Sequence, residues 1–148
     1  MPCEYGRTIM VDETDNIFRI HSSLHCGTLE FFDVLRDRHG EVEQFSVWLT
    51  DENLRAGVRV HTAYTPCLAE YFKDLAKNWS GWKGVKEWAS LERELTLKST
   101  NDGRGHITID VKLHRYWHPR DWTVQGTIFT DAGLLDRIAS DCRSFLKG

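Results

Sequence analysis

The sequence predicts an α+β protein: a mostly antiparallel sheet of about six or seven strands with two helices packed on it, the last at the C terminus. Two observations support this fold class. Apolar and polar residues alternate in several short segments, most regularly in 107–114, as in strands with one buried face. Two other segments, 66–79 and 134–146, carry apolar residues at helical spacing. Because strands and helices do not alternate along the chain, a doubly wound parallel sheet is not expected.

The first half of the chain reads as short strands separated by turns. Polar and glycine-containing stretches such as 37–40 mark the turns. Phe45, Val47 and Leu49 fall on one face of a strand, so that face is expected to be buried. The expected strands cover 8–11, 17–21, 28–34, 42–50 and a segment around 58–61.

A helix is expected to begin near Pro66. Thr65 is suited to cap it, and proline is favoured at the first helical position because its missing N–H would be unpaired there. Ser80 and Gly81 are expected to end it. The expected buried stripe is Leu68, Phe72, Leu75, Ala76 and Trp79.

From Trp88 onward the pattern predicts a three-stranded antiparallel meander closed by a helix. The first strand places Leu91, Leu95 and Leu97 inward, and the others cover 107–113 and 122–129. The helix is expected to cover the apolar face of this meander. Its stripe is Leu134, Leu135, Ile138, Ala139, Cys142, Phe145 and Leu146. The wet face of the meander is expected to include Glu92, Glu94, Asp110, Lys112 and Gln125.

The length predicts one domain covering residues 1–148, and the expected free thiols together with the missing export signal predict a cytoplasmic location. The net charge of −3 gives no reason to expect nucleic acid or an anionic membrane as partner. No apolar stretch approaches the roughly 20 residues of a membrane span, and the N terminus lacks the apolar core of a secretory signal. The four cysteines are scattered and form no C-x-x-C pair, so free thiols are expected rather than a zinc or redox site.

No motif predicts a catalytic residue, a metal site or a cofactor. G-x-G-x-x-G, G-x-S-x-G, H-E-x-x-H and phosphate-loop patterns are absent from the chain. Asp102 and His106 form the most suggestive pair, since a carboxylate can orient an imidazole that acts as a base. A pair in a glycine-rich turn more often locks that turn, and this is the preferred interpretation.

The second half of the chain resembles a known group of proteins. The resemblance rests on the segments 79–84 (Trp-Ser-Gly-Trp-Lys-Gly), 88–92 (Trp-Ala-Ser-Leu-Glu), 102–107 (Asp-Gly-Arg-Gly-His-Ile) and 133–135 (Gly-Leu-Leu). It is to a family of small uncharacterised bacterial proteins, a domain of unknown function, which is itself similar to WapI-type immunity proteins of polymorphic toxin systems. The resemblance implies a non-enzymatic protein that binds and neutralises a cognate toxin domain. On that hypothesis, Glu92, Glu94, Asp110, Lys112 and Gln125 are the expected contact residues.

Four other interpretations stay open. Trp79, Trp82 and Trp88, with Tyr116, could line a cleft for a small ligand instead of packing in the core. His106 could serve a hydrolase-like enzyme, with Asp102 and Glu92. Exposed strand edges could also pair to form a homodimer. Carboxylates in 33–52 could meet a basic toxin, although solubilising charges are the more common role.

Overall fold

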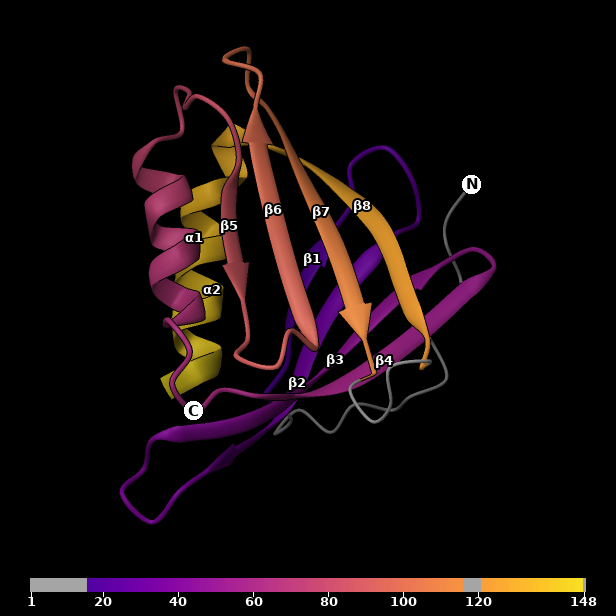
Figure 1. Ribbon diagram of the computed structural model, residues 1–148. Coiled ribbons are helices and arrows are strands. Elements are labelled where there is room, and N and C mark those ends of the chain that lie inside the picture. The colour runs from indigo at the N-terminus through magenta and orange to yellow at the C-terminus, as the bar shows by residue number, and fades with distance from the viewer. Residues whose placement is uncertain (1–15, 116–120, 148) are drawn as a thin grey trace.

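Two antiparallel sheets and two helices make up the part of the protein described by this computed structural model, residues 16–115 and 121–147 (Figure 1). The first sheet contains β1 (Phe18–His21), β2 (Thr28–Arg36), β3 (Val42–Asp51) and β4 (Leu54–His61). The second contains β5 (Lys86–Ala89), β6 (Leu95–Asn101), β7 (His106–His114) and β8 (Thr123–Asp131). Helix α1 (Leu68–Lys77) connects the sheets, and a short turn η1 (Ala132–Leu134) leads into α2 (Leu135–Lys147).

The predicted α+β class with a C-terminal helix is confirmed. Over the described residues the strands number eight rather than six or seven, and they form two sheets of four. In each sheet the strands are neighbours in sequence order, joined by consecutive antiparallel connections. The expected strand at 8–11 lies outside the described residues.

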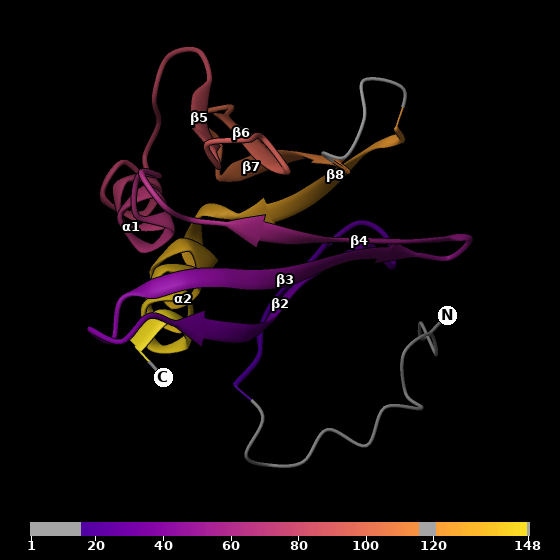
Figure 2. The same ribbon diagram turned by 60° about the horizontal axis from the view of Figure 1, so that its bottom comes forward.

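Phenylalanine rings from both helices and the first sheet meet in one hydrophobic core. The ring of Phe145 in α2 lies 6.2 Å from Phe18, 6.3 Å from Phe31 and 6.2 Å from Phe45, centroid to centroid. Phe72 of α1 meets Phe18 edge-on at 5.8 Å. Figure 2 shows both helices on the same side of the two sheets. Through Phe145 the C-terminal helix thus packs on the first sheet, a contact that the sequence pattern does not predict, because an apolar stripe does not specify which sheet it covers.

Helix α1 also contacts the second sheet through Tyr71. The Tyr71 hydroxyl donates to the Lys86 carbonyl at 3.1 Å and lies 2.5 Å from Ser99 Oγ. Burial raises the pKa of Tyr71 to about 12, so this hydroxyl stays protonated at neutral pH. The contact links α1 to both β5 and β6.

The predicted meander contains one strand more than expected. The segment taken as its first strand is divided by a turn at 90–94, with β5 before it and β6 after it. The Arg93 amide donates to the Ser90 carbonyl at 2.9 Å, and Arg93 adopts a left-handed backbone with φ of 58°. Leu91 consequently lies in the turn and is 58% exposed, so the prediction that it points inward is wrong.

Both helices differ from prediction at their ends. Helix α1 begins at Leu68 after Cys67, which makes no side-chain cap, and the Thr65 hydroxyl accepts a bond from the Leu91 amide at 3.1 Å instead. Trp79 follows the end of α1 and is 62% exposed, so it does not extend the buried stripe. Leu134 lies in η1 and is 44% exposed, in contrast to the predicted burial.

The loop 22–27 covers part of the outer edge of β8. The Ser23 amide donates to the Phe129 carbonyl at 2.8 Å, and the Phe129 amide donates to Ser22 Oγ at 3.1 Å. His25 Nε2 lies 2.9 Å from the Thr127 carbonyl oxygen. A covered edge resists pairing with another chain. A homodimer formed by strand pairing would therefore use an edge other than this part of β8.

Two further expectations concern membrane-spanning segments and the state of the cysteines. Neither described helix is long and apolar enough to cross a membrane. Cys67 and Cys142 are free thiols, whereas Cys26 takes part in a disulfide bond, so the expectation of free thiols is wrong for Cys26.

Candidate functional site

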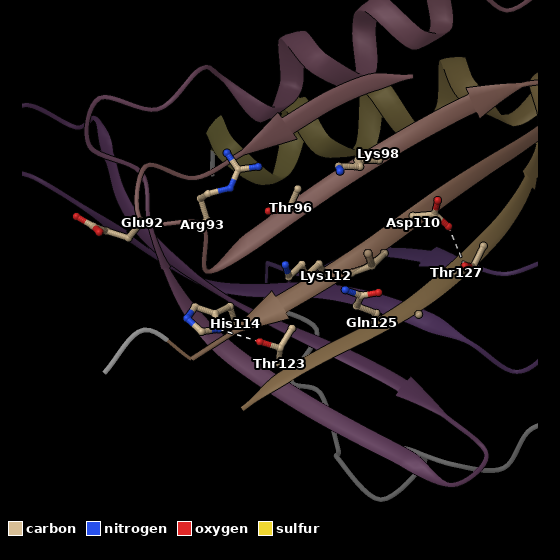
Figure 3. A pocket seen from close by; sticks show the side chains of 12 residues that line it. Glu92, Arg93, Thr96, Lys98, Asp110, Lys112, His114, Thr123, Gln125 and Thr127 are labelled. Carbon is tan, nitrogen blue, oxygen red and sulfur yellow. Dashed lines mark hydrogen bonds between the residues drawn. The ribbon is translucent and has the colours of Figure 1, made fainter. Parts of the chain in front are cut away.

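The outer surface of the second sheet is hollowed and lined by polar side chains (Figure 3). The hollow has a volume of about 730 Å³ and extends over β6, β7 and β8. We call this surface the polar face. Its residues are Thr96, Lys98, Asp110, Lys112, His114, Thr123, Gln125 and Thr127, with Glu92 and Arg93 at one end.

Strict alternation in β7 and β8 creates the polar face. Ile107, Ile109, Val111 and Leu113 are buried in the core, so the residues between them point to the opposite surface. Strand register then aligns the polar residues in rows across the sheet. Lys98 is opposite Asp110, which is opposite Thr127; Thr96 is opposite Lys112, which is opposite Gln125; His114 is opposite Thr123.

Two of the cations on the polar face form no ion pair within the part of the chain that the structure describes. Lys98 and Lys112 are exposed, and neither takes part in an ion pair or a side-chain hydrogen bond with any residue in 16–115 or 121–147. In contrast, Asp110 Oδ1 accepts a bond from the Thr127 hydroxyl at 2.9 Å, and Arg93 is paired with Glu87 at 2.5 Å. Lys98 and Lys112 lie on adjacent strands in adjacent rows, where diagonal neighbours are about 7–8 Å apart. Their two ammonium groups thus remain available for a ligand.

The structure brings together four of the five predicted contact residues. Glu92, Asp110, Lys112 and Gln125 line the hollow. The prediction is wrong for Glu94, which is only 4% exposed and points away from the polar face into the protein. The turn at 90–94 interrupts the alternation on which that prediction relied.

Glu94 instead joins the two sheets. Its Oε2 accepts bonds from the His61 amide at 3.1 Å and from His61 Nδ1 at 2.8 Å, and its Oε1 accepts one from the Ser90 hydroxyl at 2.7 Å. His61 is the last residue of β4 in the first sheet, whereas Ser90 and Glu94 flank the turn of the second. This buried carboxylate fixes the turn at one end of the polar face. Periodicity could not detect the contact, because His61 and Glu94 are 33 residues apart.

Asp102 and His106 pair at the tip of the β6–β7 hairpin. His106 Nδ1 lies 2.7 Å from Asp102 Oδ2, while Asp102 Oδ1 accepts bonds from the Arg104 amide at 2.7 Å and the His106 amide at 3.1 Å. These bonds, led by that from Arg104, hold the pKa of Asp102 below its usual value. Both side chains are exposed. The geometry is that of a carboxylate closing a turn, in agreement with the preferred interpretation.

The three candidate tryptophans occupy three different environments. Trp88 is 3% exposed, and its indole donates to the Pro66 carbonyl at 2.7 Å. Trp82 is half-buried and donates to the Ser99 carbonyl at 3.2 Å, whereas Trp79 is exposed. Trp88 therefore belongs to the core and does not line a surface cleft. Tyr116, the fourth aromatic of that hypothesis, lies outside the described residues.

Several carboxylates of the acidic stretch 33–52 hold local structure. Asp33 pairs with Arg59 at 2.9 Å, and Asp37 Oδ1 accepts bonds from the amides of His39 and Glu41. Asp51 lies 3.3 Å from His25. These bonds stabilise turns and strand edges of the first sheet, which favours a structural role over the recognition of a basic partner.

No group of three or more histidine, cysteine, aspartate or glutamate side chains in the described part of the chain is arranged to hold a metal ion.

Comparison with known proteins identifies a family whose function is unknown. A family model described as a family of unknown function, DUF6228, matches residues 20–148. No curated protein and no solved structure matches the chain.

Proposed function

The chain belongs to the DUF6228 family of unknown function, and we propose that it is a non-enzymatic protein-binding module whose polar face is the contact surface. The observation that carries this proposal is the hollow on the second sheet, with two unpaired lysines above a rigid strand ladder. A binding protein of this kind needs shape and charge that fit one partner, and it needs no reacting group.

The architecture suits recognition by a fixed surface. The rows of the polar face are set by strand register, and the opposite side of the same strands is fully packed. A packed sheet fixes the backbone from which these side chains project, so binding does not require the backbone to become ordered. Threonine and glutamine supply hydrogen-bonding groups between the charges.

The finer proposal is that the partner is a toxin domain encoded beside the gene of this chain, which the chain neutralises. Its support is the resemblance of the second half to immunity-type proteins, together with the location of the polar face in that same half. Co-expression with the neighbouring gene product tests it. Restored growth and a co-purified complex are expected, whereas a toxic neighbour that the chain neither binds nor neutralises would contradict the toxin partner.

Replacing Gln125 by tryptophan should weaken partner binding by about 100-fold, because a bulky indole in the middle of the polar face prevents close approach. Isothermal titration calorimetry with the co-purified partner measures the change. Gln125 is exposed, so the fold should be unaffected and the melting temperature unchanged.

Glu43→Trp is the matched control, since Glu43 is an exposed strand residue of the first sheet. It should bind the partner as the natural chain does. If Glu43→Trp abolished binding and Gln125→Trp did not, the contact surface would lie on the first sheet and the proposal would be wrong.

A further inference from the structure

We infer that the polar face binds an acidic polypeptide segment: two carboxylates meet Lys98 and Lys112, and an apolar side chain follows them against Tyr64 and Leu91. This inference rests on the proposed function and specifies the chemistry of the partner. Lys98 and Lys112 line the hollow, the turn 90–94 borders it through Glu92 and Arg93, and the loop that contains Tyr64 is hydrogen-bonded to this turn.

The two lysines make the surface attractive to carboxylates. Two like charges on one sheet face repel each other and do not stabilise the fold. Asp110 lies opposite Lys98 in register and its Oδ1 accepts a bond from the Thr127 hydroxyl, but it forms no ion pair with either lysine among the described residues. A ligand with two carboxylates would remove the repulsion and form two charge-assisted bonds.

Tyr64 and Leu91 are large apolar residues left in solvent. Tyr64 is 95% exposed and Leu91 is 58% exposed. Their loops are joined, since the Leu91 amide donates to Thr65 Oγ1 at 3.1 Å. Exposed aromatic and aliphatic side chains next to a charged surface are typical anchors of protein interfaces.

The backbone of these loops is held in an unfavourable conformation. Tyr64 has φ of 55° and Arg93 has φ of 58°, in the left-handed region that such residues rarely adopt. Residues held this way persist only where the surrounding structure fixes them, and they cluster at functional sites. Glu94 supplies that fixation, because it bonds His61 just before the first loop and Ser90 at the start of the second.

The order of these groups along the strands gives the length of the ligand. Lys98 lies in the first row, Lys112 in the second, and the turn with Leu91 follows the third. Rows on one face are two residues apart, about 7 Å, which is also the spacing of alternate side chains in an extended peptide. A peptide with two glutamates at alternate positions, and a leucine four residues after the second glutamate, therefore matches the surface.

A polypeptide fits this surface better than nucleic acid does. Nucleic-acid binding relies on several cationic contacts to phosphates, whereas the described part of the polar face offers two lysines outside ion pairs and the chain carries a net charge of −3. A row of phosphates offers no apolar group that could pack against Leu91. A peptide offers both carboxylates and an apolar side chain at the required spacing.

Nuclear magnetic resonance titration of the full chain with defined probes tests the inference. The probes are the acetylated and amidated peptides Glu-Thr-Glu-Thr-Thr-Thr-Leu and Lys-Thr-Lys-Thr-Thr-Thr-Leu and a short oligothymidine, each at low ionic strength. The acidic peptide should shift the amide signals of β6, β7 and the two loops, and the basic peptide should not. Lys98→Gln with Lys112→Gln should weaken acidic-peptide binding about tenfold.

Lys73→Gln with Lys77→Gln is the matched control, because both lysines are exposed on α1 away from the polar face. This double variant should bind as the natural chain does. Equal binding of both peptides, binding of oligothymidine alone, or no effect of Lys98→Gln with Lys112→Gln would overturn the inference. If the acidic peptide does not bind but Gln125→Trp still abolishes binding of the protein partner, the acidic segment is refuted and the proposed function stands.

Discussion

Replacing Glu94 by alanine should lower the free energy of unfolding by about 3 kcal/mol. The carboxylate is nearly fully buried and accepts three bonds, two from His61 and one from the Ser90 hydroxyl. The truncation would leave the buried Ser90 hydroxyl without this partner and would open a small cavity where β4 meets the second sheet. Urea unfolding monitored by circular dichroism measures the loss.

Glu92→Ala is the control, since Glu92 has the same chemistry two residues earlier and is exposed. Its effect should stay within about 0.5 kcal/mol. Equal effects of the two variants would show that Glu94 does not join the sheets. Glu94→Ala should also weaken partner binding, because the turn next to the polar face would lose its fixed position.

Replacing Phe145 by alanine should destabilise the protein by about 4 kcal/mol, the cost of removing a buried aromatic ring. Phe145 is 1% exposed and contacts the rings of Phe18, Phe31 and Phe45. The cavity would lie between α2 and the first sheet, where rigid β-strands limit collapse. Thermal unfolding of the variant measures the loss.

Leu134→Ala tests whether Leu134 is exposed, as in the structure, or buried, as the sequence pattern predicts. The pattern places Leu134 in the same buried stripe as Phe145, but the residue is 44% exposed. Its replacement should therefore change stability by less than about 1 kcal/mol. A loss as large as that of Phe145→Ala would mean that α2 begins earlier and packs differently.

The fold was predictable wherever a residue pattern reports directly on burial. The alternation of 107–113 identified β7 and its wet face, including Asp110 and Lys112, because successive side chains of a strand point to opposite surfaces. The turn at 90–94 escaped detection, since it contains no glycine, proline or asparagine and depends on Arg93 in a left-handed conformation.

The candidate site was predictable in part. Residues of the polar face could be named from the alternation, but their rows depend on strand register, which pairs residues far apart in sequence. The role of Glu94 depends on a contact with His61 in the other sheet. A local pattern contains no information about that contact, so Glu94 appeared to be one more exposed carboxylate.

Lysine acetylation of the free chain and of its complex, followed by mass spectrometry, shows whether the polar face is the contact surface. Lys98 and Lys112 lie on the polar face, whereas Lys73 and Lys77 are exposed on α1. The partner should protect Lys98 and Lys112 from acetylation and leave Lys73 and Lys77 as reactive as in the free chain. A complex in which Lys98 and Lys112 react as fast as in the free chain would contradict the assignment of the polar face as the contact surface.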